Sequence, residues 1–274
     1  MTPFQALILG IIQGVTEFLP ISSSGHLVLV PWLLNWDLDP SAAFIFDVLV
    51  QWGTILAVIL YFRRELLGMI TAVLRGISRR RPFEDSEARL AWLILLASVP
   101  AAVLGLLLKP AIEKAFDSPL AVSFFLLVTA GILFISERLH RAEKPVRALN
   151  WVDSLWIGLA QALALFPGIS RSGSTIAGGL LRSLKREDAA RFSFLLAIPA
   201  MLGAGTIALL DLSNIPDPGS QLLSLTIGFA SAAIVGMATI HWLLSYLRHH
   251  SLDVFAIYCA LVGLGGLILY AIKG

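Results

Sequence analysis

Two short polar stretches interrupt an otherwise apolar chain, and their residue types suit the binding and chemistry of phosphate. The first, "QGVTEFLPISSSGH", spans 13–26 and contributes Gln13, Glu17, Ser22, Ser23, Ser24 and His26. The second, "PGISRSGST", spans 167–175 and contributes Ser170, Arg171, Ser172, Ser174 and Thr175. A guanidinium among hydroxyl donors binds phosphate oxygens well, while a carboxylate and a histidine can hold a cation and move a proton.

The spacing within both stretches predicts half-helices that end and begin at these residues. Gln13 and Glu17 are four apart, so they share one face of a helix that Pro20 ends. Gly25 and Gly173 allow a sharp turn and a close approach of the backbone to a ligand. A new half-helix begins beyond each glycine, and its free N–H groups and positive dipole end favour an anion.

The composition identifies the class of protein in which these stretches lie. The chain has 274 residues, of which 57% are hydrophobic and only 14% are charged, against about 25% charged in soluble proteins. We therefore expect an all-α polytopic membrane protein and no nucleic-acid partner. Cys259 is the single cysteine, which excludes disulfides and cysteine-ligated metals. The sequence contains no Walker loop, zinc-binding His/Cys cluster or nucleophile elbow.

Apolar runs of membrane-spanning length divide the chain into two similar halves within a single membrane domain, 1–274. We predict six transmembrane helices, at 42–62, 91–108, 119–136, 192–210, 222–247 and 254–272. The regions 4–34 and 152–181 are also apolar, but Pro, Ser and Gly break each of them centrally. We expect both to be re-entrant helix-loop-helix segments. The first repeat then covers 1–148 and the second 149–274.

The two broken regions resemble each other at a fixed offset of 148 residues. Identical residues occupy the pairs Gly10/Gly158, Gln13/Gln161, Phe18/Phe166, Ile21/Ile169, Ser22/Ser170, Ser24/Ser172 and Gly25/Gly173. Each half carries three spans, an odd number, so the second half is predicted to be inverted relative to the first. In inverted repeats with interrupted helices, the site lies near the membrane midplane, where the repeats meet.

The distribution of basic residues tests this topology independently. The connections 63–90, 137–151, 182–191 and 245–253 would share one side, and they hold sixteen of the 20 Lys and Arg residues. Lys109, Lys114 and Lys273 fall on the other side, and Arg171 lies at the second tip. By the positive-inside rule, both termini are external, and the first broken segment enters from the external side and the second from the cytoplasmic side.

Simpler structural roles remain open for several of these residues. Ser22, Ser24, Ser172 and Ser174 are each as compatible with helix caps as with ligands. An ion pair of Arg171 with Glu17 is either structural or functional. Each charge at mid-membrane costs about 2.5–3.5 kcal/mol, and such charges usually mark a substrate path. Asp47 and Gln51, one turn apart in the first span, either line the same cavity or pair with a neighbouring helix.

At these residues the chain resembles the undecaprenyl-diphosphate phosphatase family, also called bacitracin-resistance proteins. The family's first motif, Glu or Gln, three residues and then Glu, matches Gln13 to Glu17, and "FLPISSSGH" follows it. Its second, Pro-Gly-x-Ser-Arg-Ser-x-x-Thr, matches Pro167 to Thr175. The length and the two-half layout agree over essentially the whole chain. Gln13 is the weaker of the two residues that the first motif permits.

The resemblance implies a membrane phosphatase of the bacterial cell membrane, with an active site open to the external face. Its substrate would be undecaprenyl (C55 isoprenyl) diphosphate, cleaved to the monophosphate and inorganic phosphate with a divalent cation, Mg²⁺ or Ca²⁺. The product would be the lipid carrier for peptidoglycan and other wall polymers, and high activity would confer bacitracin resistance. The expected partners are the isoprenyl diphosphate and membrane lipids, and a homo-oligomer is left open.

The residues then take the following expected roles. Glu17, Ser23, His26 and Arg171 are catalytic, and Glu17 with Gln13 holds the cation. The phosphate-binding residues are Ser22, Ser24, Gly25, Ser170, Arg171, Ser172, Gly173 and Thr175. Ser23 is favoured as the nucleophile with His26 as its base, while attack by His26 or by water stays open. A transporter or flippase using the same inverted-repeat cavity is the alternative function.

Overall fold

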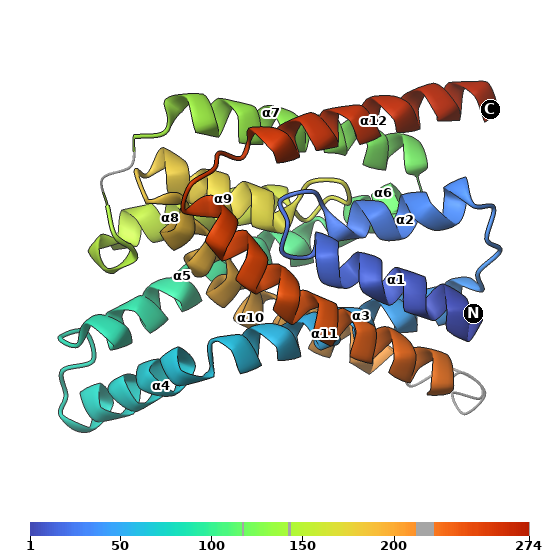
Figure 1. The fold of residues 1–274 in the computed structure, drawn as a ribbon. Coiled ribbons are helices and arrows are strands. Elements are labelled where there is room, and N and C mark those ends of the chain that lie inside the picture. The colour runs from blue at the N-terminus through green and yellow to red at the C-terminus, as the bar shows by residue number, and fades with distance from the viewer. Residues whose placement is uncertain (117, 142–143, 212–221, 274) are drawn as a thin grey trace.

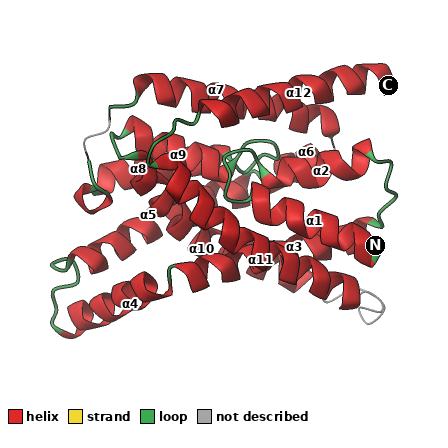
Figure 2. Ribbon diagram, viewed as in Figure 1, coloured by secondary structure: helices red, strands yellow, loops and turns green. Residues whose placement is uncertain are grey.

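In the computed structural model, every regular element of the described residues is a helix (Figure 2). The structure describes residues 1–116, 118–141, 144–211 and 222–273, and for residues 40, 41, 204 and 206–211 it describes the backbone alone. An isolated bridge joins Lys144 to Leu184. The prediction of an all-α chain is therefore confirmed for this part of the protein.

The helices follow one another with short connections. In the first half they are α1 (Pro3–Thr16), α2 (Ser23–Leu33), α3 (Pro40–Tyr61), α4 (Arg63–Ser78), α5 (Ser86–Leu107), α6 (Lys109–Phe116) and α7 (Pro119–Leu139). The 3-10 helix η1 (Val146–Ala148) ends the first half. In the second half the helices are α8 (Trp151–Leu163), α9 (Arg171–Leu181), α10 (Arg186–Asp211), α11 (Leu222–Leu247) and α12 (Asp253–Lys273).

Long helices occupy all six regions that were predicted to span the membrane. Among the described residues, α3, α5, α7, α11 and α12 are long and apolar enough to cross a membrane. Helix α10 is not among these five. Its first turn contains Arg186, Glu187 and Asp188, so the helix begins well before its apolar part at Phe192.

The connection 63–90 contains a helix that the sequence analysis did not predict. Helix α4 places Leu67, Ile70, Leu74 and Ile77 three or four residues apart, and all four side chains are exposed. Helices with one apolar and one basic face commonly lie in the membrane interface.

Helices α1 and α8 begin at opposite ends of the molecule, and both end near its middle (Figure 1). From there α2 returns to the end where α1 began, and α9 returns to the end where α8 began. Local capping fixes where the two outer helices start. Thr2 forms a capping box with Gln5 at α1, and Asn150 forms one with Asp153 at α8.

Small residues allow the half-helices to pack closely against long helices. Helix α1 lies along α11, where a Cβ added to Gly10 would come within 2.6 Å of the Gly228 carbonyl oxygen. Helix α8 lies along α5, where a Cβ added to Gly158 would come within 2.5 Å of the Ala97 carbonyl oxygen. Gly10 and Gly158 are matched residues of the two halves, and they make corresponding helix contacts.

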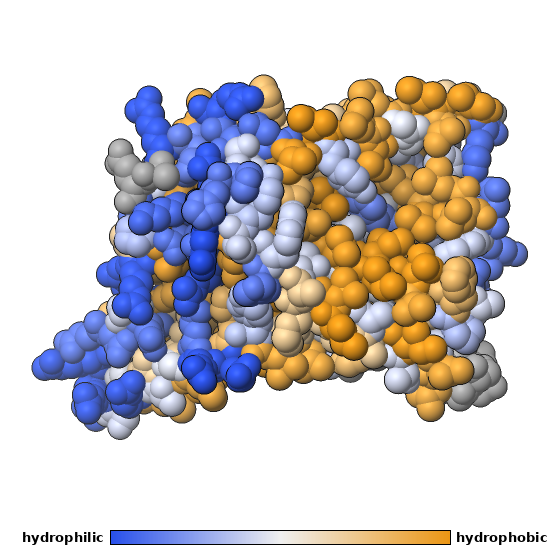
Figure 3. Space-filling view, viewed as in Figure 1, coloured by the Kyte–Doolittle hydropathy of each residue, from blue (hydrophilic) through white to orange (hydrophobic). Residues whose placement is uncertain are grey.

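The surface is strongly divided by polarity (Figure 3). Hydrophilic side chains gather at the end that holds α4 and the starts of α5 and α8, and apolar side chains cover most of the middle. On this face the protein therefore has an apolar middle and one hydrophilic end, which we call the basic end because the arginine-containing α4 and the run Arg79–Arg81 lie there.

Candidate active site

Two non-helical tips, residues 17–22 and 164–170, meet near the middle of the molecule. Ser22 caps α2 from a left-handed backbone conformation (φ 70°), and Gly168 supplies the positive φ (97°) in the second tip. Helix α7 fixes this second tip. The Thr129 hydroxyl donates to the Gly168 carbonyl oxygen at 2.8 Å and accepts from the Ser170 amide at 3.0 Å.

Matched serines of the two tips make the same contacts within their own tips. The Ser22 hydroxyl accepts from the Gly25 amide at 3.3 Å and lies 3.3 Å from the Ser24 hydroxyl. The Ser170 hydroxyl accepts from the Gly173 amide at 3.0 Å and lies 3.1 Å from the Ser172 hydroxyl. Ser22 and Ser170 therefore act as N-caps, the simpler of the roles open to such serines.

The tips also cross each other closely. A Cβ added to Gly25 would lie 3.3 Å from Gly168 Cα, and one added to Gly173 would lie 3.4 Å from Pro20 Cβ. Each half-helix N-terminus therefore abuts the tip of the other half. This arrangement directs the first turns of α2 and α9 toward the same region, where their free N–H groups favour an anion.

Glu17 and Arg171 form an ion pair between the two tips. Arg171 Nη2 donates to Glu17 Oε1 at 2.7 Å, and Arg171 Nη1 donates to the Ser193 carbonyl oxygen at 2.9 Å. The other carboxylate oxygen of Glu17 accepts from Ser23 Oγ at 2.6 Å and from Gln13 Nε2 at 3.0 Å. Glu17 is buried and Arg171 is largely so, with 7% and 16% of their side chains exposed.

His26 lies at the same tip but is not hydrogen-bonded to Ser23. Its Nδ1 lies 2.7 Å from the Ser22 carbonyl oxygen, and its Nε2 lies 2.8 Å from the Tyr258 hydroxyl. The two rings also stack, with centroids 5.7 Å apart. Because the Ser23 hydroxyl donates to Glu17, the base next to Ser23 in this structure is the carboxylate.

The matching family model is that of the bacitracin resistance protein BacA, and it covers residues 6–265. A protein of Chlorobium phaeobacteroides named undecaprenyl-diphosphatase is 45% identical over 279 residues, with 99% of this chain and 98% of the relative covered. One of Myxococcus xanthus with the same name is 44% identical, with 98% and 89% covered. The chain belongs to the BacA family.

In this BacA-family chain, several residues that were predicted to bind phosphate are already hydrogen-bonded to other protein atoms. The Ser172 hydroxyl donates to the Leu19 carbonyl oxygen at 2.9 Å. The Thr175 hydroxyl lies 2.6 Å from the Ser193 hydroxyl. Ser23, Ser24 and Arg171 are partly exposed, so they are the side chains best placed to meet a phosphate group.

Asp47 and Gln51 are not part of this network. Among the described residues, no hydrogen bond links either side chain to the two tips, and both side chains are half-buried in α3. The geometry thus brings together Glu17, Ser23 and Arg171, and it leaves these two residues outside.

Three contributing residues were not identified from sequence. Tyr258, Ser193 and Thr129 come from α12, α10 and α7. Tyr258 and Thr129 are isolated polar residues in apolar runs, and Ser193 follows Arg191 by two residues. Neither pattern identifies the tip that each residue contacts.

The oxygen atoms around Glu17 fit a hard divalent cation. Gln13 is fully buried, and its Oε1 has no hydrogen-bond partner. Together with the Glu17 carboxylate it offers the oxygen ligands that Mg²⁺ and Ca²⁺ prefer. No group of three or more His, Cys, Asp or Glu side chains that could hold a metal ion occurs among the described residues, so substrate oxygens or water would complete such a site.

Proposed function

We propose that the chain hydrolyses undecaprenyl diphosphate to undecaprenyl phosphate and inorganic phosphate at the two crossed tips. Its membership of the BacA family and its near full-length similarity to relatives named undecaprenyl-diphosphatase support this activity. The observation that carries the assignment of the site is the buried Glu17–Arg171 pair with the Ser23 hydroxyl beside it. Such a phosphatase recycles the lipid carrier of cell-wall synthesis, and bacitracin resistance follows from high activity.

Arg171 and the N-termini of α2 and α9 bind the negatively charged diphosphate. The guanidinium is held by Glu17 and the Ser193 carbonyl oxygen, so it meets the substrate already oriented. Pre-oriented donors in a water-poor site stabilise the charge that develops in the transition state more strongly than donors in water do. A cation held by Glu17 and Gln13 would neutralise further charge on the substrate.

Ser23 attacks the terminal phosphorus, and Glu17 accepts the hydroxyl proton. The 2.6 Å hydrogen bond from Ser23 Oγ to Glu17 Oε2 supports this choice of base over the sequence-based choice of His26. The bond to the bridging oxygen then breaks, and undecaprenyl phosphate leaves with its negative charge balanced by Arg171. Water hydrolyses the phosphoserine in a second step.

The membrane arrangement that we propose has six spans and two re-entrant segments, α1–α2 and α8–α9, in an inverted repeat. The corresponding contacts of Gly10 and Gly158 and the crossed contacts of Gly25 and Gly173 support the repeat. The basic end of the molecule supports a cytoplasmic location for α4 and for the start of α8. Both termini and the opening of the site would then be external.

The decisive experiment measures phosphate release from undecaprenyl diphosphate by the purified protein in detergent, where no vectorial transport can occur. We expect turnover by the wild type and a loss of at least about tenfold in Arg171→Lys, because the single nitrogen of lysine cannot replace the planar fork whose two nitrogens bond Glu17 and the Ser193 carbonyl oxygen. Arg138→Lys, at an exposed ion pair with Asp253, is the matched control. A wild-type protein that releases no phosphate would favour the transporter or flippase.

A further inference from the structure

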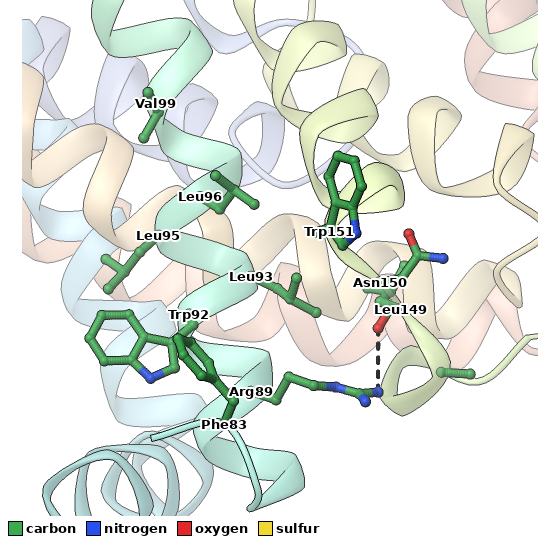
Figure 4. Close-up of a pocket in the computed structure, with 11 residues that line it drawn as sticks. Phe83, Arg89, Trp92, Leu93, Leu95, Leu96, Val99, Leu149, Asn150 and Trp151 are labelled. Atoms are coloured by element: carbon green, nitrogen blue, oxygen red, sulfur yellow. Dashed lines mark hydrogen bonds between the residues drawn. The ribbon is translucent and has the colours of Figure 1, made fainter. Parts of the chain in front are cut away.

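A cavity whose lining includes no residue of the two tips lies at the basic end of the molecule. It has a volume of about 720 Å³ and opens between α5 and the segment that joins η1 to α8. Figure 4 shows Leu93, Leu96 and Val99 along one wall, Trp151 on the other and Arg89 across one end. This volume falls in the range of small-molecule binding sites, about 300–1,000 Å³.

The polar end of this cavity carries the positive charge of the Arg89 guanidinium. Arg89 is exposed, and its Nη2 donates to the carbonyl oxygens of Arg147 at 2.8 Å and of Leu149 at 3.4 Å. These contacts orient the guanidinium but leave its charge intact, and no ion pair of Arg89 occurs among the described residues.

The apolar walls lie where a hydrocarbon chain would run. Leu95 and Val99 are each about half exposed, at 49% and 50%, on the outer face of α5. Trp92 lies beside the cavity, and its Nε1 donates to the Pro82 carbonyl oxygen at 3.1 Å, which ties the α4–α5 loop to this helix. Tryptophans at this level are typical of the boundary between headgroups and acyl chains.

We propose that this cavity is a binding site for an anionic phospholipid of the cytoplasmic leaflet. The headgroup phosphate lies on the Arg89 guanidinium, and one acyl chain follows Leu96 and Val99 toward the middle of the membrane, against Trp151. Basic pockets between helices on the cytoplasmic side are recognised sites for anionic headgroups. We propose an anionic rather than a zwitterionic lipid because Arg89 is positively charged. We propose a lipid rather than free phosphate because the cavity wall is apolar.

Bound lipid would contact the helix that carries the second tip. The cavity lies at the start of α8, and α8 packs along α5 where Gly158 meets Ala97. An acyl chain between Trp151 and Val99 would therefore lie between α8 and α5, on the cytoplasmic side of this helix contact. The site is separate from the residues assigned to hydrolysis, so its test does not depend on the proposed function.

Quenching of tryptophan fluorescence by lipids with brominated acyl chains provides a direct test. The full chain is reconstituted into phosphatidylcholine vesicles that contain phosphatidylglycerol, with bromine on one or the other lipid. The signal of Trp151 is the difference between the wild type and Trp151→Phe. We expect brominated phosphatidylglycerol to occupy the cavity with about fivefold preference at low salt, the contribution of one arginine near an anionic headgroup. The preference should fall in 1 M salt.

The variants separate a specific site from general attraction to an anionic surface. Arg89→Gln should abolish the preference, whereas Arg89→Lys, which keeps the charge, should retain most of it. Arg75→Gln removes an exposed arginine of α4 that does not line this cavity and should change nothing. Equal quenching of Trp151 by both brominated lipids in the wild type, or equal losses in Arg89→Gln and Arg75→Gln, would overturn the proposal. So would shielding of Trp151 from both lipids, which would indicate a protein partner.

Discussion

At the scale of single residues, the Ser23 hydroxyl is the group whose surroundings differ most from those of its neighbours. Ser22 and Ser170 cap helices, and Ser172 and Thr175 bind protein oxygens. Ser23 instead donates to a buried carboxylate while staying partly exposed. This combination of an adjacent base and access for substrate is what an attacking hydroxyl requires.

We therefore expect Ser23→Ala to lose far more activity than its neighbour Ser24→Ala. Loss of a single hydrogen bond to a charged group costs about 1.5–3 kcal/mol, whereas loss of a nucleophile leaves only binding and electrostatic stabilisation. Turnover is measured at saturating substrate and cation. Acid quenching during turnover should trap phosphoserine at Ser23. A phosphohistidine at His26, with Ser23→Ala retaining a tenth or more of wild-type turnover, would contradict this assignment.

Tyr258 is expected to act as a positioning residue for His26. Tyr258→Phe removes the 2.8 Å hydrogen bond to Nε2 and keeps the ring stacking. The loss of one such bond is about 1 kcal/mol, so kcat should fall by about fivefold with KM nearly unchanged. The pH profile of kcat should keep its shape, because Glu17 and not His26 accepts the Ser23 proton in the proposed mechanism. If kcat is unchanged, the contact has no role in turnover.

At the scale of helices, close packing of the half-helices depends on single glycines. A Cβ at Gly158 would press against the Ala97 carbonyl oxygen, and this backbone atom cannot move without displacing α5. Gly131 in α7 has nothing within 4 Å of its Cβ position. The two glycines therefore form a matched pair for substitution by alanine.

Gly158→Ala is expected to destabilise the protein, and Gly131→Ala to leave it unchanged or more stable. Overpacking costs about 1–3 kcal/mol, and alanine gains about 0.5–1 kcal/mol over glycine within a helix. Thermal unfolding in detergent measures both changes. If the midpoints of the two variants agree within error, α8 and α5 are not as tightly packed as the structure indicates.

An ion-pair cluster holds the start of α8 against the segment between the two halves. Asp153 is fully buried, and it accepts from Lys144 at 2.8 Å and from Arg182 at 2.6 Å. Burial by itself would raise the pKa of this carboxyl, but the hydrogen bonds from the two cations outweigh burial and hold the pKa below its ordinary value. The unfolded carboxyl has a pKa of about 3.9.

Because the folded pKa is the lower one, Asp153 should stabilise the protein above about pH 4 and lose this contribution as pH falls further. The thermal midpoint should therefore decline between pH 5 and pH 3. Asp153→Asn should lower the midpoint at neutral pH and flatten this decline. Asp37→Asn, at an exposed carboxyl, should do neither. If the thermal midpoint of Asp153→Asn declines with falling pH as steeply as that of the wild type, carboxyls other than Asp153 cause the decline.

Hydropathy and helix-breaking residues were sufficient to predict the long helices and the position of both tips. Pro20 and Gly168 break runs that are otherwise apolar, so the interruptions are visible in the sequence itself.

The predicted pair of Glu17 and Arg171 is also present, because these are the only oppositely charged residues at the tips. The contact of His26 with Tyr258 could not be predicted, since it joins residues 232 apart and depends on how α12 packs. The three- or four-residue spacing of Leu67, Ile70 and Leu74 was a usable signal for α4.

At the scale of the whole molecule, the proposed orientation has a direct test. In a Cys259→Ala background, Asp37→Cys lies between α2 and α3, and Glu84→Cys lies between α4 and α5. Both positions are exposed. An impermeant thiol reagent added to intact cells should label the cysteine at 37 and not the one at 84, because the arginine-rich end is expected to face the cytoplasm. The reverse pattern would overturn the external opening of the site.

The ion pair of Glu17 with Arg171 has a consequence for how the protein is made. The two residues are 154 positions apart, and they come from different halves of the chain. During synthesis, α1 and its carboxylate enter the membrane before the guanidinium has been translated. The nascent first half therefore carries an acidic group without its counter-ion, and a protonated or hydrated carboxyl is the cheaper state in lipid. A chain that ends before α9 lacks Arg171, so we expect it to hydrolyse no undecaprenyl diphosphate.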